Sequence, residues 1–169
     1  MRNRAAPPLG FRAGGKENTD CRAFYICPIF LFVADHTETP AVIEGAFTRL
    51  EPARRVALGW ASVVSVGGAD IVDKQDDILD LDSLDVAVHG YMIESRETGE
   101  MHRTFGIGKV VGSLVVTPEK LSALGMTSDR MGWVVEVFIE DMDVWAKVVD
   151  GTYPAFSIGG VGIYDEAAA

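Results

Sequence analysis

Three long runs of β-branched and aromatic residues constrain the fold of this chain most strongly; they cover residues 56–66, 109–117 and 132–139. Glycines follow the first run, and Pro118 follows the second. Runs of this composition, bounded by Gly or Pro, are typical of β-strands. We therefore expect a sheet in which these runs are strands.

A helix is predicted between the first two runs. Its apolar residues recur at the spacing i, i+3, i+4, i+7 and i+8, which places them on one face of a helix. Asp82 or Ser83 is a suitable N-cap, and Asp85 suits the positive end of the helix dipole. His89 lies off the apolar face and is expected at the surface. The residues of the apolar face are Leu84, Ala87, Val88, Tyr91 and Met92.

A second, shorter helix is predicted after Asp141, which can serve as its N-cap, and Gly151 is expected to end it. Residues 119–131 are polar, so we expect a loop between strands there. The strand spacing is typical of hairpins rather than of regular βαβ units. This predicts an α+β fold with a mostly antiparallel sheet or barrel. The second helix is expected to present Val144, Trp145, Val148 and Val149 on one apolar face, directed either to the core or to a partner chain.

Length and charge limit the possible functions. A chain of 169 residues fits one domain, and a net charge of −10 argues against a nucleic-acid surface, which needs a basic patch. The apolar run 23–34 is shorter than the ~20 residues of a membrane-spanning helix. No nucleic-acid or membrane partner is therefore expected. The chain has 2 cysteines, which do not imply a disulfide framework and are compatible with a reducing cytoplasm.

The N-terminal third differs from the rest in composition. Residues 1–22 are rich in Arg, Gly, Pro and Ala and are expected to be disordered. Residues 23–54, which contain Pro40 and Pro52, are expected to form loops with at most short elements. We therefore predict a leader over 1–54, largely disordered or loosely packed, and a folded domain over 55–169.

Aspartates are frequent between Asp70 and Asp85, which suggests a calcium loop. An EF-hand loop that began at Asp80 would need Gly at its sixth position and Glu at its twelfth. Asp85 and Tyr91 occupy those positions, so the motif fails. The segment is better interpreted as an acidic loop before a helix, and no metal or other cofactor is expected.

The segment 155–160 has the pattern of a nucleophile on a strand. Phe156 and Ile158 would point to one face of an extended chain and Ser157 to the other. Gly159 and Gly160 allow close approach to the backbone, and their N–H groups could hold an oxyanion. An ordinary strand serine would show the same local pattern, so a candidate base is needed to distinguish the two.

His102 is the candidate base, in a short segment expected to be extended. A serine hydroxyl needs a nearby base, and histidine titrates near neutrality. The base needs a partner that fixes its tautomer. Glu100 is one candidate for this third role, and Asp165, Asp73 and Asp77 are alternatives between which the residues do not decide. Glu100 and His102 could also suggest a metal site, but no second histidine lies at ligand spacing.

From about Arg55 to its end the chain resembles the phage serine proteases of the XkdF type, which are prohead (capsid maturation) proteases. Each matching piece is short, but their order and spacing together are specific. The pieces are Gly59-Trp60-Ala61, residues 72–78, the helix after them, and residues 99–102, 105–108, 132–135, 144–148 and 156–160.

The resemblance implies a fold like that of the herpesvirus assemblins, with Ser157 as nucleophile and His102 as general base. It implies an endopeptidase that cleaves phage scaffold and major capsid proteins, inside the prohead in the bacterial host cytoplasm, and that acts as a homodimer. Related proteases place a third catalytic residue well after the serine. In this chain that residue could be Asp165, Glu166 or Glu100, or it could be missing.

Another class of function remains open. A non-catalytic phage head protein, a structural or scaffold module, could have the same fold. A competent serine nucleophile would react with a fluorophosphonate probe, whereas a structural module would not.

Overall fold

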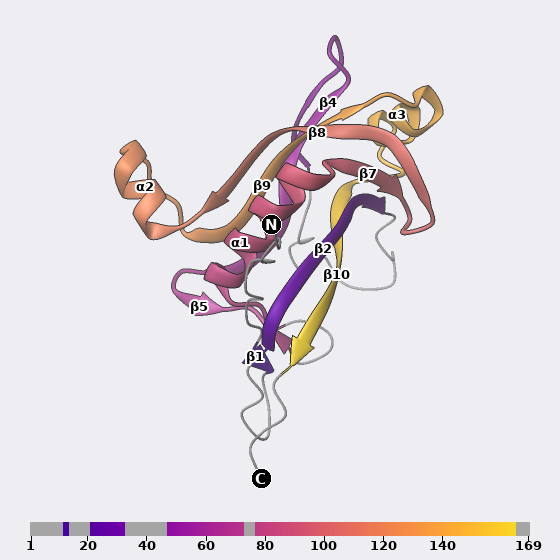
Figure 1. Cartoon of the computed structure of the whole chain (residues 1–169). Helices are drawn as coiled ribbons and strands as arrows, with labels where there is room; N and C mark the ends of the chain where they lie inside the picture. Colours follow the sequence, from indigo (N-terminus) through magenta and orange to yellow (C-terminus); the bar gives the residue numbers. More distant parts are fainter. Residues whose placement is uncertain (1–11, 14–20, 33–46, 73–76, 165–169) are drawn as a thin grey trace, which may run out of the picture.

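The structure is a computed structural model that describes residues 12–13, 21–32, 47–72 and 77–164. Its elements combine one large sheet with helices (Figure 1). The helices are α1 Leu81–Glu94, α2 Pro118–Leu124 and α3 Met142–Val149. The strands are β1 Arg12–Ala13, β2 Cys21–Phe32, β3 Phe47–Glu51, β4 Val56–Val66, β5 Ala69–Asp70, β6 Asp77–Ile78, β7 Glu97–Glu100, β8 Thr104–Val116, β9 Arg130–Ile139 and β10 Ala155–Tyr164.

The large sheet has the strand order β10-β2-β7-β8-β9-β4-β3, with β5 added to β4. All its pairs are antiparallel except β2 with β7. The predicted α+β class with a mostly antiparallel sheet is therefore confirmed. The three predicted strands are also confirmed, as β4, β8 and β9.

The two outer strands of this sheet approach each other. The Phe47 N–H at the start of β3 donates to the Pro154 carbonyl just before β10, at 3.0 Å. The Phe47 ring also packs edge-on against Phe156, with centroids 4.8 Å apart. These contacts curl the sheet around one apolar core, so that it resembles a partly closed barrel.

Helix α1 packs into this core as its apolar pattern predicts. Leu84, Ala87, Val88 and Tyr91 are buried, and the Tyr91 ring meets Trp133 of β9 edge-on at 5.5 Å. The predicted N-cap at Asp82 or Ser83 is wrong. Asp80 is the cap, because its carboxylate accepts hydrogen bonds from both the N–H and the hydroxyl of Ser83 at 2.9 Å.

Helix α3 begins as predicted, since the Asp141 carboxylate accepts from the N–H groups of the first turn. Val144, Trp145 and Val148 are buried in the core, so this face is directed inward rather than to a partner chain. Val149, the last helical residue, is 52% exposed, which contradicts its predicted burial. The apolar face of α3 therefore gives no independent support for a dimer.

Helix α2 replaces the loop predicted for residues 119–131. The Thr117 hydroxyl accepts from the Lys120 N–H at 3.3 Å, Pro118 occupies the first turn, and Gly125 ends the helix with φ +63°. Proline at the first helical position needs no N–H partner, and glycine adopts the left-handed conformation without strain. These cap signals outweigh the polar composition that suggested a loop.

The prediction of loops with at most short elements over 23–54 is wrong. Strand β2 has 12 residues and lies in the sheet between β10 and β7. Pro28 cannot donate to a sheet ladder, and it falls where the register with β10 shifts between the Ile158–Ile29 and Gly160–Ile26 pairs. The bulge accommodates Pro28 within the strand. The disorder predicted for residues 1–11 and 14–20 lies outside the described residues.

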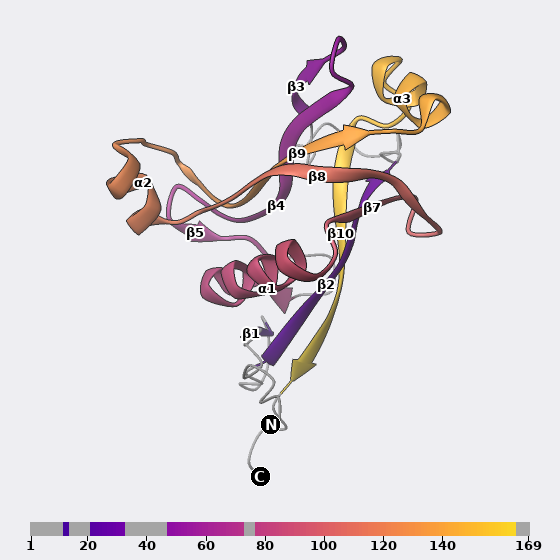
Figure 2. The ribbon, with the colours of Figure 1, turned by 45° about the horizontal axis from the view of Figure 1, so that its top comes forward.

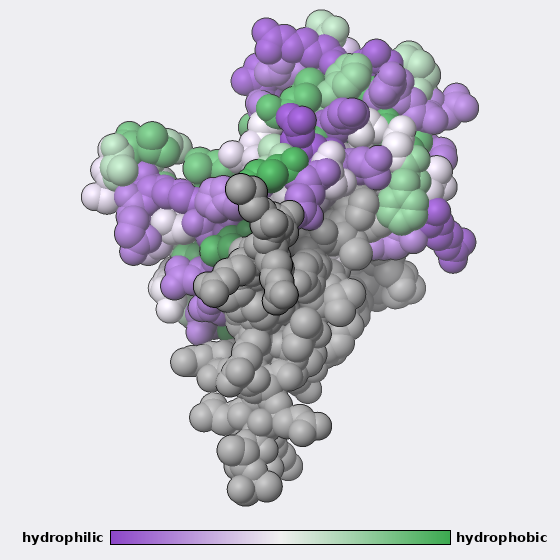
Figure 3. Space-filling model, viewed as in Figure 1, coloured by the Kyte–Doolittle hydropathy of each residue, from purple (hydrophilic) through white to green (hydrophobic). Residues whose placement is uncertain are grey.

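Helices α2 and α3 lie at opposite ends of the described fold, and β2 and β10 run side by side (Figure 2). Hydrophilic residues cover much of the described part of one face, with apolar groups at the α2 end (Figure 3). Leu124 and Met126 are among the exposed apolar residues there. None of the helices in the described part of the chain is long and apolar enough to cross a membrane.

Candidate active site

Ser157 lies on β10 with the alternation predicted for this strand. Phe156 is 2% exposed and Ile158 packs against the core, whereas Ser157 is half-buried. The two apolar neighbours hold the strand on the core, because removing such side chains from water is favourable. The Ser157 hydroxyl is therefore presented by a strand whose opposite face is held on the core.

Strand β2 sets the spacing between the two halves of the site. Ser157 pairs with Phe30 of β2, and Phe30 pairs in turn with Gly99 of β7. Adjacent strands lie about 4.8 Å apart, so Ser157 and Gly99 are separated by two such spacings. The chain turns three residues after Gly99, and a side chain from that turn can reach back to the serine.

His102 occupies this turn and not an extended segment. The extended conformation predicted for residues 100–102 is therefore confirmed for Glu100, the last residue of β7, and wrong for Met101 and His102. The Glu100 carbonyl accepts from the Arg103 N–H at 3.0 Å, which closes a tight turn between β7 and β8. Met101 and His102 have φ values of +51° and +55°. Positive φ at both central positions is the pattern of a type I′ hairpin turn. Glu100 and His102 therefore do not share one face of a strand.

The turn brings His102 to Ser157. The His102 Nε2 and the Ser157 Oγ are 3.1 Å apart, although the residues are 55 positions apart in sequence. With the ring proton on Nδ1, Nε2 accepts the hydrogen bond from the serine hydroxyl. This is the distance at which a histidine base can take a serine proton.

His102 is exposed overall, but partial desolvation lowers its pKa from the ordinary value, because desolvation disfavours the charged ring. The imidazole is then mostly neutral at pH 7 and has a lone pair available for a proton. The geometry and the protonation state both suit general-base chemistry.

The carboxylate of Glu100 is engaged elsewhere. Its Oε1 accepts from the Lys147 ammonium at 2.6 Å and from the Tyr153 hydroxyl at 2.5 Å. The hydrogen bond from Lys147, followed by that from Tyr153, lowers the pKa of Glu100. Glu100 is thus a carboxylate at neutral pH, held by two residues that were not among the predicted site residues.

The other candidates for the third role are not placed by the structure. Asp73, Asp165 and Glu166 lie outside the described residues, and only the backbone of Asp77 is described, in β6. The identity of the third catalytic residue stays a prediction.

Gly159 and Gly160 lie in β10 directly after Ser157 and Ile158. The regular pairing with β2 is interrupted between Ile158 and Gly160. The extra residue of this irregularity lies on β2, where Cys27 and Pro28 face Gly159 alone. The role of Gly159 and Gly160 in holding an oxyanion stays a prediction.

His89 is exposed, with its Nδ1 3.7 Å from an Asp85 oxygen, as expected for a surface histidine. Across the described ranges of the chain, no group of three or more His, Cys, Asp or Glu side chains is arranged to hold a metal ion.

A comparison with protein families places these residues in context. Residues 54–166 match the family described as "Putative phage serine protease XkdF". The chain belongs to this family. The match covers the strand of Ser157 and the turn of His102, but it begins after β2. No curated protein and no solved structure matches the chain. The likeness to the herpesvirus assemblin fold therefore stays a prediction.

Two residues of the site region were missed in the sequence. Lys147 lies on the polar side of α3 and Tyr153 follows Gly151, and neither position has a spacing that points to Glu100. Only the folded arrangement of α3 beside β7 brings them together. A polar residue in the last turn of an amphipathic helix gives too general a signal to identify such a contact.

Proposed function

We propose that this member of the phage serine protease family is an endopeptidase in which Ser157 is the nucleophile and His102 the general base. The observation that carries the proposal is the 3.1 Å contact between His102 Nε2 and Ser157 Oγ. Ser157 comes from strand β10 and His102 from the turn between β7 and β8, and the ring is neutral near pH 7. Within a family described as serine proteases, this pair has the geometry that the reaction needs.

In the proposed reaction, Ser157 Oγ attacks the peptide carbonyl carbon while its proton passes to His102 Nε2. The peptide C–N bond then breaks, and His102 returns the proton to the leaving amine. Water then attacks the acyl carbon while His102 takes one of its protons. The ester C–O bond breaks, the product leaves as a carboxylic acid, and His102 returns the proton to Ser157 Oγ. The N–H groups of Gly159 and Gly160 are proposed to hold the oxyanion, because they are the first backbone donors after Ile158 on the serine strand.

The proposed substrates are phage scaffold and major capsid proteins, cleaved within the prohead in the bacterial host. The support is the description of the family as a phage protease and the resemblance to prohead proteases in the segments around Ser157 and His102.

Labelling tests the proposal directly. The protein is incubated with a fluorophosphonate probe, digested, and the modified peptide is identified by mass spectrometry. Modification of Ser157, blocked in Ser157→Ala, supports a serine hydrolase. Absence of labelling, together with an intact cognate scaffold protein after incubation, would favour a structural head module instead.

The rate of cleavage should depend on pH through His102. Only the neutral imidazole accepts the serine proton. The value of kcat/KM should therefore rise as pH increases through the pKa of His102 in the free enzyme. Because burial lowers that pKa, the midpoint should lie below the ordinary histidine value of about 6.5. A pH–rate profile between pH 4 and 9 measures the midpoint. A rate that stays flat from pH 5 to 8 would contradict a histidine base.

A homodimer is proposed as the active form, on the resemblance to prohead proteases alone. If a dimer is required, specific activity should fall on dilution in proportion to the monomer fraction. Sedimentation and activity measured over the same concentration series check this. Full specific activity of a protein that sediments as a monomer would remove the dimer from the proposal and leave Ser157 and His102 in place.

A further inference from the structure

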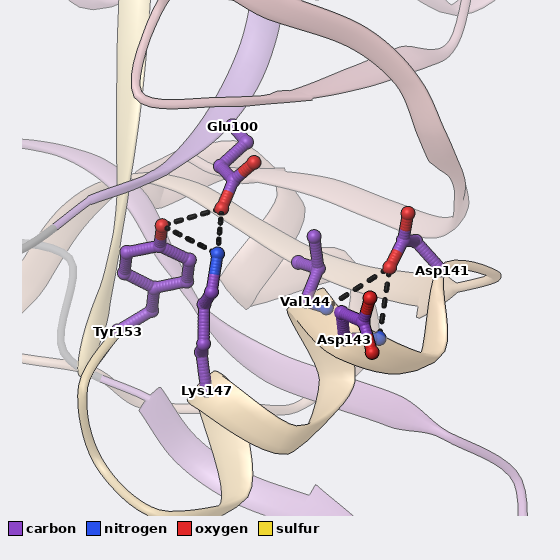
Figure 4. Close-up of polar contacts among 6 residues, drawn as sticks. All are labelled: Glu100, Asp141, Asp143, Val144, Lys147 and Tyr153. Carbon is purple, nitrogen blue, oxygen red and sulfur yellow. Dashed lines mark hydrogen bonds and ion pairs between the residues drawn. The ribbon is translucent and has the colours of Figure 1, made fainter.

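Glu100, Lys147 and Tyr153 form a polar cluster, named here the Glu100 cluster (Figure 4). Glu100 Oε1 lies 2.6 Å from the Lys147 ammonium and 2.5 Å from the Tyr153 hydroxyl, and the last two groups are 3.4 Å apart. The Lys147 ammonium also lies 5.2 Å from the centre of the Tyr153 ring. Each member therefore contacts both of the others.

The cluster joins the two elements that carry the proposed site. Glu100 is the last residue of β7 and directly precedes Met101 and His102, the two central residues of the turn. Tyr153 is buried in the connection between α3 and β10, shortly before Ser157. Its N–H donates to the Lys147 carbonyl at 2.9 Å, so its backbone and its side chain are both tied to Lys147. The cluster thus links the histidine turn to the chain that enters the serine strand.

Helix α3 is itself well anchored, which makes Lys147 a fixed point. The Asp141 Oδ1 accepts from the N–H groups of Asp143 and Val144 at 2.9 and 3.0 Å (Figure 4). The buried side chains of Val144, Trp145 and Val148 hold the helix in the core. Lys147 projects from this fixed helix toward Glu100.

The turn of His102 needs support of this kind. Met101 and His102 both have φ near +50°. A non-glycine residue in this region costs roughly 1–3 kcal/mol, and such strain persists only where the surroundings determine the conformation. Glu100 is the residue through which the polar contacts of α3 act on this turn.

The charges of the cluster favour the bound arrangement. The hydrogen bond to Glu100 raises the pKa of Lys147, and burial raises the pKa of Tyr153. The pKa of Glu100 is lowered by its hydrogen bonds. At neutral pH the members are therefore an ammonium, a carboxylate and a neutral phenol, which is the combination that the observed hydrogen bonds require.

We infer that Lys147, with Tyr153, is a positioning residue that holds the His102 turn against Ser157 through Glu100. The inference rests on the proposed function for its catalytic meaning. It assigns Glu100 a role that does not require contact with the His102 ring, unlike that of a third catalytic residue. The reacting groups remain His102 and Ser157, and the Glu100 cluster determines how closely they approach.

The test is Lys147→Met in the full chain, with Lys120→Met as a matched control. Lys120 forms an ion pair with Asp85 at the same 2.6 Å, between α2 and α1, with a similarly exposed side chain. A misplacement of about 1 Å can cost on the order of a hundredfold in rate. We expect Lys147→Met to lower kcat about ten- to a hundredfold with little change in KM, whereas Lys120→Met stays within about twofold.

A second measurement follows His102 itself and does not require activity. The chain has 3 histidines, so the ring signals of His102 can be assigned by NMR with His102→Gln. If the turn loosens, the ring becomes more hydrated and its pKa should rise toward the ordinary value. The rise is expected in Lys147→Met and not in Lys120→Met. This readout separates positioning from a general loss of stability.

Milder variants keep the test decisive if Lys147→Met does not fold. Tyr153→Phe removes one hydroxyl and keeps the buried ring, and Lys147→Arg keeps the charge and donors. We expect both variants to lose less kcat than Lys147→Met, and Lys147→Arg to lose the least.

The outcomes of the inference and of the proposed function are distinguishable. If Lys147→Met or Tyr153→Phe matches Lys120→Met in both kcat and His102 titration, the positioning role is overturned. If the wild-type protein neither labels nor cleaves, the proposed function fails. The His102 titration alone then decides whether Lys147 holds the turn.

Discussion

Ser157→Ala and His102→Ala should each reduce cleavage of a cognate scaffold protein by roughly 10⁴-fold or more. In the proposed mechanism the serine supplies the attacking oxygen, and the histidine, 3.1 Å away, is the base that removes its proton. Because the two groups act as a unit, the double variant should be hardly slower than either single variant. Initial rates on purified scaffold protein, with intact mass of the products, measure these losses.

His89→Ala and Ser113→Ala are suitable controls. His89 is an exposed histidine on α1, and the Ser113 hydroxyl accepts from the Trp133 indole N–H at 2.9 Å, within the sheet. Both substitutions should leave kcat/KM near the wild-type value. Near-normal activity in His102→Ala would show that the base is another residue, whereas near-normal activity in Ser157→Ala would remove the serine mechanism.

Local patterns in the sequence were sufficient to predict much of the sheet and the core face of α1. The β4 run and the spacing of Leu84, Val88 and Tyr91 are period-2 and period-3.6 signals of burial, and burial is what stabilises these elements. The start of α3 at Asp141 was also predictable, because a cap is a local interaction. Such features depend on residues that are close in the chain.

Strand β2 could not be predicted in the same way. Pro28 argues against a strand, and only pairing with β10 on one side and β7 on the other makes an extended conformation favourable there. Long-range pairing of this kind leaves no periodic signal. It nevertheless decides the site, because β2 lies between the strand of Ser157 and the strand that leads to His102.

The pairing of Ser157 with His102 was predictable as chemistry but not as geometry. Residue types suggested a nucleophile and a base, whereas the turn with positive φ at Met101 and His102 contains no glycine to signal it. The same limit applies to Glu100. Its proximity to His102 in sequence suggested a direct contact, but its carboxylate is bound by Lys147 and Tyr153.

Gly132→Ala, within a strand, should destabilise the protein more than the same change at the described turn and cap glycines with positive φ. Gly132 lies in β9 opposite Val63 of β4, with φ +145°, a conformation that side chains rarely adopt. A Cβ atom there would lie 2.8 Å from the Val63 Cα and closer still to the Ser62 carbonyl oxygen. Both neighbours are backbone atoms of β4, so they cannot move without separating β4 from β9.

Gly125→Ala is the control that separates strain from crowding. Gly125 has φ +63° at the end of α2, and nothing lies within 4 Å of a Cβ placed there. Gly125→Ala should lower the free energy of unfolding only by the backbone strain, about 1–2 kcal/mol. For Gly132→Ala, strain of about 1–3 kcal/mol adds to overpacking of about 1–3 kcal/mol. Urea unfolding gives both free energies by linear extrapolation.

A total loss of about 2–6 kcal/mol is a large part of the 5–15 kcal/mol typical of a folded domain. Trp133, fully buried beside Gly132, packs on Tyr91, whose hydroxyl donates to the Glu97 carbonyl at the start of β7 at 2.6 Å. Displacement of β9 should therefore reach the strand that ends at Glu100, so Gly132→Ala should also lower activity below the melting transition. Equal free energies of unfolding for Gly132→Ala and Gly125→Ala would show that the β4–β9 pair yields at this point, and that the close backbone contact at Gly132 is not a constraint on the fold.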